Sequence, residues 1–355
     1  MNEAVVLVAT GASTPVGRSA PASAAAVRAG ITGFTQHPYL VDTVGEPVRA
    51  AIAPWLDIAL AGADRLEALL FPAIDEALAI LRKAAEPGSK VMPMAIALGL
   101  ASPRPGVPGN LQSTMKARLR DKYGAQFSSA ACFAAGHAAS LLALDAAISK
   151  LRQGTLQACM VAGVDSMIDA QALEWLESCD QLHGAGHMNN AWGLIPGEGA
   201  GALLLMGATT AKRLGLPPLA TLLGAGLAQE PKCIKTDTVC TGEGLTSALK
   251  AALVALPREG KVSDIYCDMN GEPYRADEFG FAALRTKAHF ENAGDFLAPA
   301  DCWGDMAAAG GALHVMLAAA AINKGYARGP HSLVWASSEG GDRAAVLLSA
   351  ALSGG

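Results

Sequence analysis

The feature that most constrains this fold is an order of elements that occurs twice in the chain. Each copy has a helix rich in small residues, then a buried strand, a loop and a second buried strand. The predicted elements of the two copies are, in chain order, 131–151, 156–162, 201–206, 305–323, 332–336 and 344–348. This order predicts an internal duplication, with one half over residues 1–207 and the other over residues 208–355.

Further strands and helices are expected outside the repeat. Periodicity predicts strands at 4–9 and 94–100 and helices at 65–85 and 112–123. Hydrophobic residues make up 51% of the chain but aromatic residues only 5%, so Ala and Gly must fill much of the interior. Helices that pack closely on buried strands in two related halves predict an α/β fold with five layers, αβαβα.

Several classes of protein are disfavoured by charge and composition. The net charge is -5, and no dense run of Lys and Arg could neutralise the phosphates of a nucleic acid. No apolar run reaches the roughly 18 residues of a membrane span, and no basic region precedes the first apolar strand. The seven cysteines form no CxxC pair, which disfavours structural zinc. We therefore expect a cytosolic protein without a metal or cofactor.

Two glycine-rich segments invite a phosphate-binding interpretation that their details do not support. In 6–17 a glycine turn follows a strand, but Pro15 stands where a dinucleotide fingerprint needs a glycine. None of the five tyrosines has a lysine four residues later, so the catalytic pair of a short-chain dehydrogenase is missing as well. In Gly197–Gly201 the glycines precede a strand, so we expect them to allow two segments to approach closely.

Cys132 is the candidate nucleophile. It lies near the start of the predicted helix 131–151, where the helix dipole favours a thiolate and free N–H groups can stabilise an oxyanion. The alternative is a buried structural cysteine, since free cysteine packs as a small hydrophobe. His137 is expected to pack elsewhere, because five residues along a helix turn it about 140° away from Cys132.

The residues around Cys132 resemble a known family. Residues 128–138 look like the nucleophile segment of β-ketoacyl-acyl-carrier-protein synthases, which are thiolase-fold condensing enzymes. Residues 193–201 are similar to the glycine-glutamate loop of that family, and 160–166 to the strand between. The resemblance implies thiolase-like αβαβα layers, an acyl group taken from an acyl carrier protein or coenzyme A, and a homodimer or a heterodimer with a ketosynthase-like subunit.

The chain departs from the family at the other catalytic positions. Asn270 and Asp305 stand where the resemblance places two histidines, and Ala300 is nearest to the usual lysine. In 338–341, Glu339 replaces an aromatic gate residue and is followed by Gly340 and Gly341. The predicted site is therefore Cys132, Asn270 and Asp305, with a loop formed by Glu339, Gly340 and Gly341.

These replacements change the chemistry that the site can support. An enolate needs neutral or cationic donors, which Asn270 can supply and an ionised Asp305 cannot. Asp305 can instead be the N-cap of its helix, and Asn270 suits the turn before Gly271. Two groups of charged side chains are expected on exposed helix surfaces. The alternative for the first group is a place in the site, and for the second the docking of an acidic carrier protein. The groups are Glu272, Arg275, Asp277 and Glu278, and Lys116, Arg118, Arg120 and Lys122.

Two functions stay open at this point. The first is an acyltransferase that forms an acyl-thioester on Cys132, with thioester hydrolysis as a variant. The second is a non-catalytic thiolase-fold partner, comparable to the degenerate subunits that pair with active ketosynthases, or an assembly protein. The altered residues also resemble ketosynthase-like proteins associated with bacterial type VI secretion loci.

Overall fold

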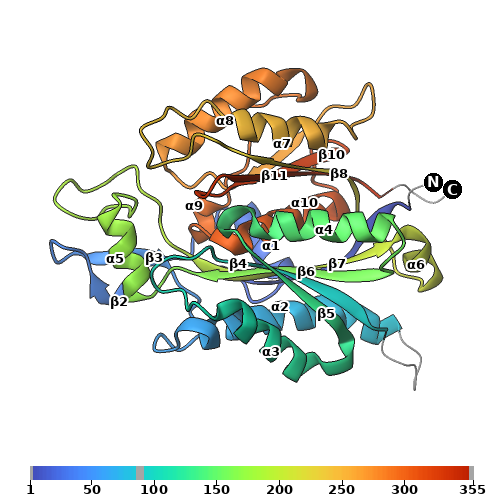
Figure 1. The fold of residues 1–355 in the computed structure, drawn as a ribbon, viewed down its shortest axis with the longest axis horizontal. Coiled ribbons are helices and arrows are strands. Elements are labelled where there is room, and N and C mark those ends of the chain that lie inside the picture. Colours follow the sequence, from blue (N-terminus) through green and yellow to red (C-terminus); the bar gives the residue numbers. More distant parts are fainter. Residues whose placement is uncertain (1–2, 85–91, 352–355) are drawn as a thin grey trace.

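The computed structural model describes residues 3–84 and 92–351 and shows alternating layers of helices and strands (Figure 1). The strands are β1 Val5–Ser13, β2 Phe34–Val41, β3 Pro47–Ala51, β4 Met94–Leu100, β5 Phe127–Ala134, β6 Ala158–Ser166, β7 Glu198–Gly207, β8 Ala220–Gln229, β9 Asp264–Cys267, β10 His331–Ser337 and β11 Asp342–Ser349. The helices are α1 Ala20–Arg28, α2 Gly62–Ala84, α3 Leu111–Tyr123, α4 Ala139–Arg152, α5 Ala170–Ser178, α6 Ala208–Arg213, α7 Glu243–Leu253, α8 Pro273–Thr286, α9 Ala300–Trp303 and α10 Gly310–Lys324. Single 3-10 turns are η1 Gly124–Gln126, η2 Gly136–Ala138, η3 Lys287–His289 and η4 Ala307–Ala309.

Nine strands form one mixed sheet in the order β5-β4-β6-β7-β1-β8-β11-β10-β9. Strand β1 pairs with β7 from Val5 to Ser13 but with β8 only from Val5 to Leu7. Because this second pairing is short, the sheet divides beyond it into two layers, with β4, β6 and β7 in one and β8, β10 and β11 in the other (Figure 1). Strands β2 and β3 form a separate hairpin.

Three hydrophobic cores lie between the layers. Helices α2 and α3 cover the outer face of the first sheet layer, with Leu69 and Met115 in the core. Helices α7 and α8 cover the outer face of the other layer around Phe279 and Trp335. Between the two layers lie α4 and α10, whose apolar residues share one core with both (Figure 1). The predicted αβαβα arrangement is confirmed.

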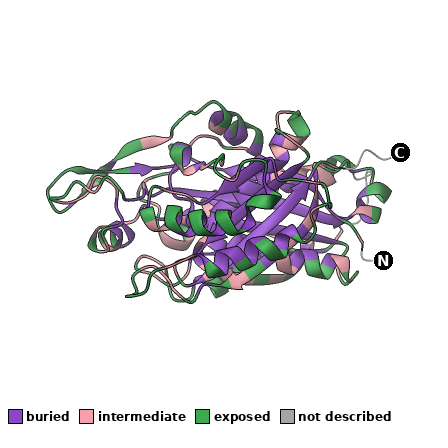
Figure 2. Ribbon diagram, turned by 90° about the horizontal axis from the view of Figure 1, so that it is seen from above, coloured by how far each residue is buried: buried purple, intermediate pink, exposed green. Residues whose placement is uncertain are grey.

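The burial pattern shows why the central helices are rich in small residues. Buried residues gather on the central strands, and exposed residues on the outer surfaces of the covering helices (Figure 2). Helix α10 is buried along nearly its whole length, from Gly310 to Ala319. A helix enclosed by two sheets needs side chains that let the backbones approach, and Ala and Gly provide them.

Most of the predicted elements are present, and two predicted helices begin too early. Strand β4 has the predicted bounds, and α2 and α3 agree to within a few residues, although Ala85 lies outside the described residues. The helices predicted at 131–151 and 305–323 instead begin at Ala139 and Gly310. Both errors fall at the turns that carry the candidate site.

The turn predicted over 11–17 begins later than expected, since β1 continues through Ser13 and the chain turns between Thr14 and Gly17. A Cβ atom on Gly11 would lie 1.9 Å from the carbonyl oxygen of Ala73 in α2. The glycine therefore lets α2 pack closely on β1 and does not form a phosphate-binding turn.

Within the described residues, no helix combines the length and the apolarity that a bilayer crossing would require.

Candidate functional site

Cys132 lies in a strand and not at a helix N-terminus. Strand β5 pairs in parallel with β4, and Cys132 stands opposite Leu98. This pairing overrides the helix propensity of the Ala-rich segment, a tertiary effect that local sequence does not report. The thiol is half-buried, with Sγ 3.9 Å from the carbonyl oxygen of Gln112. Burial raises the pKa of Cys132, and Lys116 offsets the effect only in part, so the thiol is not activated.

His137 occupies the turn between β5 and α4. Gly136 begins the turn with a φ of 69°, a left-handed conformation that favours glycine. The N–H of Ala138 donates to Oγ of Ser338 at 2.8 Å, which fixes the turn against the loop between β10 and β11. The side chain of His137, only 11% exposed, points at residues of the C-terminal half. The prediction that His137 packs away from the site is wrong, because the helix begins after it.

Asp305 stands opposite His137. Its backbone N–H donates to the carbonyl of Ile195 at 2.7 Å, and its carbonyl accepts from Gly197 at 3.0 Å. Oδ1 accepts from the N–H of Ala307 at 2.7 Å, so Asp305 braces the turn η4. Asp305 therefore caps this turn rather than helix α10, whose N-cap residue is Ala309.

His137 and Asp305 form a buried pair. Nε2 of the imidazole lies 2.9 Å from both carboxylate oxygens of Asp305. Burial alone would lower the pKa of His137, but the charge of Asp305 raises it overall. Burial would raise the pKa of Asp305, but His137, Arg275 and Asn270 hold it well below its usual range. These opposite shifts favour an imidazolium paired with a carboxylate.

Asn270 and Arg275 complete a polar cluster around this pair. Nδ2 of Asn270 donates to Asp305 at 2.6 Å and to Glu272 at 2.9 Å. Arg275 donates to Asp268 at 2.8 Å, and its Nη2 lies 3.1 Å from Nε2 of His137. An imidazole without a proton on Nε2 accepts this N–H, so the contact competes with the proton that Nε2 shares with Asp305.

The expectation of a solvated acidic helix start around Arg275 is largely wrong. Arg275 and Glu278 are fully buried and Glu272 is 5% exposed, while Asp277 is exposed. One signal of this burial was available in the sequence. Arg275 lies three residues after Glu272 on a partly apolar helix, and a cation that is buried there needs acidic partners.

The predicted gate loop is brought to the same cluster. Glu339, Gly340 and Gly341 lie between β10 and β11, and Glu339 accepts from Gln181 at 2.6 Å and pairs with Lys235 at 3.1 Å. Burial would raise the pKa of Glu339, but these two partners lower it. Gln181 also donates to Glu272 at 2.8 Å, which connects the loop to the cluster. These contacts of Gln181 could not be predicted, because Gln181 lies in a loop that is distant in the sequence.

The glycine-glutamate loop holds the backbone of Asp305 in place. A Cβ atom on Gly197 would lie 2.5 Å from the carbonyl oxygen of Trp303, so the close approach of two segments is confirmed. Glu198 is fully buried and accepts from Arg65 at 2.5 Å and 2.7 Å. It also accepts from the N–H of Ala53 at 2.8 Å. The loop is therefore a structural clamp.

The cluster leaves almost no open space. The cavity that His137, Asn270 and Asp305 line has a volume of only ≈ 10 Å³. That is about the space that one water molecule requires. Cys132 does not line it, so the structure brings together two of the three predicted catalytic residues and adds His137 in place of the third.

The sequence of the chain was compared with protein families and curated proteins. Residues 97–211 match the family model described as beta-ketoacyl synthase, N-terminal domain. This segment contains β5, the turn with His137, α4, β6 and the glycine-glutamate loop. No curated protein matches the chain.

Solved structures match over nearly the whole chain. The complex described as "AntDE:AntF (apo): type II PKS acyl-carrier protein in complex with its ketosynthase bound to the hexaketide" aligns with a TM-score of 0.81, 15% identity, and coverage of 99% of this chain and 100% of the other. The ishigamide ketosynthase/chain length factor aligns with a TM-score of 0.70, 21% identity, and coverage of 98% and 99%. The ketosynthase from module 6 of the bacillaene synthase of Bacillus subtilis 168 aligns with a TM-score of 0.76, 14% identity, and coverage of 99% and 72%.

At these identities the matches establish the fold, and none of the three concerns type VI secretion, so that similarity stays a prediction. The predicted thiolase-like fold agrees with them, since these neighbours are ketosynthases or a ketosynthase with its chain length factor. Residues 97–211 therefore match the beta-ketoacyl synthase N-terminal domain model, and the chain as a whole has the thiolase-type fold of ketosynthases.

Proposed function

We propose that this chain is a non-condensing partner of a ketosynthase-like subunit, comparable in role to a chain length factor. The observation that carries the proposal is the buried pair of His137 and Asp305. His137 lies in the turn between β5 and α4, and Asp305 stands at one of the two altered histidine positions. An imidazolium has no free lone pair with which to attack a thioester. A cavity of ≈ 10 Å³ also has no room for an acyl chain at this point.

The geometry weighs against acyl transfer through Cys132. Its thiol has a raised pKa and lies on the edge strand β5. Neither Asn270 nor Asp305 is among its hydrogen-bond partners, and Asp305 is engaged by His137, Asn270 and Ala307. A nucleophilic cysteine needs a lowered pKa or an adjacent base, and Cys132 has neither.

Ion pairs within the chain weigh against docking of a carrier protein on α3. Arg118 pairs with Asp64 at 2.6 Å and Glu67 at 2.9 Å, and Lys122 pairs with Asp75 at 2.9 Å. Most of the positive charge on this helix is thus balanced within the chain. We infer that the ketosynthase-like partner binds on a surface other than α3.

Strand β5 is the surface on which we place the partner. It lies at one end of the sheet order and pairs only with β4 among the described strands. Ser128, Ser129 and Ala131 are exposed along it. An unpaired edge strand offers a row of N–H and C=O groups to a second chain. One of the similar structures is a ketosynthase with its chain length factor, which supports a subunit pair of this kind.

Intact-protein mass spectrometry tests the absence of acyl transfer. The chain is incubated with acyl-coenzyme A and acyl-carrier-protein donors, beside a Cys132→Ser control. We expect no adduct on the folded chain. An acyl adduct on the wild-type protein that Cys132→Ser abolishes would instead establish the acyltransferase function.

Sedimentation tests the pairing surface. Wild-type chain, Ala131→Arg in β5 and Leu284→Arg in α8 are compared, alone and with a ketosynthase subunit. Leu284 is 68% exposed and serves as the matched control. We expect Ala131→Arg to weaken association at least about tenfold, since a bulky charge at the core of an interface is disfavoured. Association that Ala131→Arg leaves unchanged would exclude β5 as the interface.

A further inference from the structure

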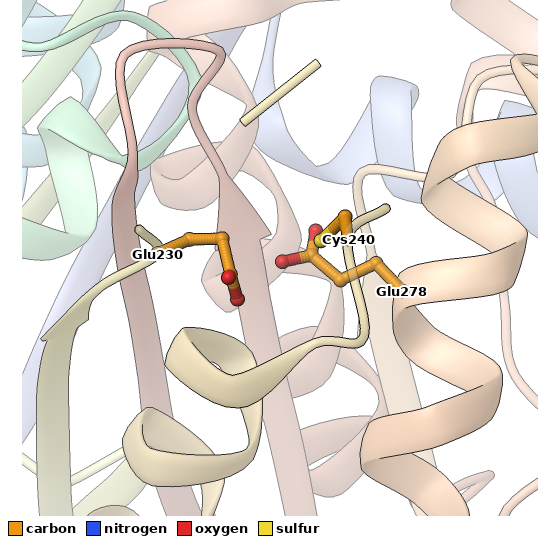
Figure 3. Close-up of side chains that lie close together, drawn as sticks. All are labelled: Glu230, Cys240 and Glu278. Carbon is orange, nitrogen blue, oxygen red and sulfur yellow. The ribbon is translucent and has the colours of Figure 1, made fainter. Parts of the chain in front are cut away.

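A second group of ionisable side chains lies in the C-terminal half and is independent of the function proposed above. Glu230 follows β8, Cys240 lies in the loop before α7, and Glu278 lies on α8. One ligand atom from each lies within 4.8 Å of the others. The side chains of Cys240 and Glu278 face each other, and Glu230 approaches from the end of β8 (Figure 3).

The hydrogen bonds of the two carboxylates leave one strong acceptor without a partner. Oε1 of Glu278 accepts from Nε of Arg343 at 2.6 Å, but Oε2 is buried and has no hydrogen-bond partner. The Glu278 residue is 0% exposed. Oε2 of Glu230 accepts from the N–H of Gly244 at 2.7 Å, while Oε1 has only a long contact of 3.3 Å with the N–H of Lys232. A buried carboxylate oxygen without a donor is costly, so it indicates a missing partner.

The charge at the group is also unbalanced. Arg343 is buried beside Glu278 and is the only cation that the described residues pair with either carboxylate. The amine of Lys232 pairs instead with the exposed Glu243 at 3.5 Å. Two buried carboxylates with one guanidinium leave a net negative charge next to a thiol. A cation at the centre would balance that charge, and the free oxygen of Glu278 would coordinate it.

We propose that Glu230, Cys240 and Glu278 bind a divalent metal ion, and that the ion is Zn²⁺. A thiolate selects zinc over magnesium or calcium, and carboxylates complete zinc sites. Tetrahedral bonds of about 2.0–2.3 Å hold ligand atoms about 3.3–3.8 Å apart, so the group must contract slightly around the ion. Cys240 is only partly buried and lies in a loop, which allows this movement and leaves a fourth position for water.

A shared proton is the competing arrangement. Burial raises the pKa of Glu278, and Arg343 lowers it only in part. Burial also raises the pKa of Cys240. A protonated Glu278 could donate to Glu230 without any metal, and such a pair would bind no zinc.

Metal titration of the full chain distinguishes the two arrangements. The protein is stripped with a chelator and titrated with Zn²⁺ by calorimetry, and with Co²⁺ while the near-ultraviolet absorption is recorded. We expect one equivalent of metal and a thiolate-to-cobalt charge-transfer band. Cys240→Ser should abolish the band and Glu278→Gln should weaken zinc binding at least about tenfold. Cys179→Ser, at a half-buried cysteine that directly follows α5, is the control and should change neither.

Two results would overturn the proposal. One is a folded wild-type chain that binds no stoichiometric metal or shows no charge-transfer band with cobalt. The other is a band that survives Cys240→Ser, which would assign the metal to another thiol. The wild-type measurement decides the matter even if a variant fails to fold, and it does not depend on whether the chain transfers acyl groups.

Discussion

The two copies of the helix-strand repeat enter their central helices through the same kind of turn, but the turns carry different residues. Turns η2 and η4 are single 3-10 turns that lead directly into α4 and α10. Each begins with a positive φ, 69° at Gly136 and 39° at Ala307. Glycine adopts this conformation freely, whereas alanine is strained in it.

The difference explains the division of labour between the two turns. In η4 the strained turn is held by carboxylates, because Asp305 accepts from Ala307 at 2.7 Å and Asp165 accepts from Ala308 at 3.2 Å. In η2 the glycine adopts this conformation without strain. The side chain of His137 is therefore not needed to hold its own turn and pairs with Asp305. The ion pair thus joins the side chain displayed by one turn to the residue that braces the other.

Asp305→Ala should have the largest effect on stability, because it acts on both turns. The change removes the brace of η4, leaves the buried His137 without Asp305 and leaves Asn270 with Glu272 alone as acceptor. We expect the free energy of unfolding to fall by about 3–5 kcal/mol, as when one partner of a buried pair is deleted. Urea denaturation measures the loss. His137→Ala should cost less, and the double variant should cost less than the sum, because the two residues share one interaction. Additive losses would show that the pair does not couple the turns.

The pH dependence of stability should distinguish the contribution of His137, in the turn η2, from that of His314 on α10. His137 has a raised pKa when folded, so its stabilisation is complete below the unfolded value of about 6.5 and is lost as the pH rises through the folded value. Burial lowers the pKa of His314 on α10 to about 4, so its neutral form stabilises above about pH 6.5 and the protein loses stability as the pH falls towards 4.

These two windows predict a maximum of stability near about pH 6.5, with a loss of about 3 kcal/mol on the acid side and a further loss on the alkaline side. Urea midpoints from acid to alkaline pH measure the profile. His137→Gln should flatten only the alkaline side and His314→Gln only the acid side. An alkaline decline that persists in His137→Gln would contradict the ion pair.

Exchanging the residues that begin the turns should sharpen the comparison further. Gly136→Ala should destabilise by about 1–2 kcal/mol, since it introduces a left-handed alanine. A Cβ there would also lie 3.3 Å from Oγ of Ser102. Ala307→Gly should change stability by at most about 1 kcal/mol in the favourable direction, because relief of strain is partly offset by the entropy of the unfolded glycine. Thermal unfolding of both variants tests this, and equal effects of one sign would refute the assigned strain.

Cys132→Ser should have the smallest effect. The thiol is half-buried and makes one weak contact, so we expect a change within about 0.5 kcal/mol. Chemical denaturation checks it. A loss several times larger would mean that the thiol packs more tightly than its position on β5 indicates.

The repeat itself was predictable, whereas the start of each central helix was not. The apolar periods of β4, α2 and α3 are local signals, and the structure reproduces them closely. Residues 131–134 are Ala-rich and look helical on their own. They are extended because β4 pairs with them, and β4 lies more than 30 residues earlier in the chain. Local propensity cannot report such a pairing.

The candidate site was predicted in part for the same reason. Asn270 and Asp305 were found through the resemblance to β-ketoacyl synthases, which places two histidines at these positions. His137 was missed because its role depends on the helix beginning two residues after it. Gly136 directly before His137 was the available signal, since a glycine often marks a turn into a helix. The roles of Arg275 and Gln181 depend on partners far along the chain.

The shared central core has a consequence for how the chain folds. Leu141 and Leu144 of α4 pack in the same core as Leu313 and Leu317 of α10, between both sheet layers. Fragments 1–207 and 208–355 would each expose one side of that core to water. The two segments are therefore not expected to be stable on their own, and the whole chain should unfold in a single cooperative transition.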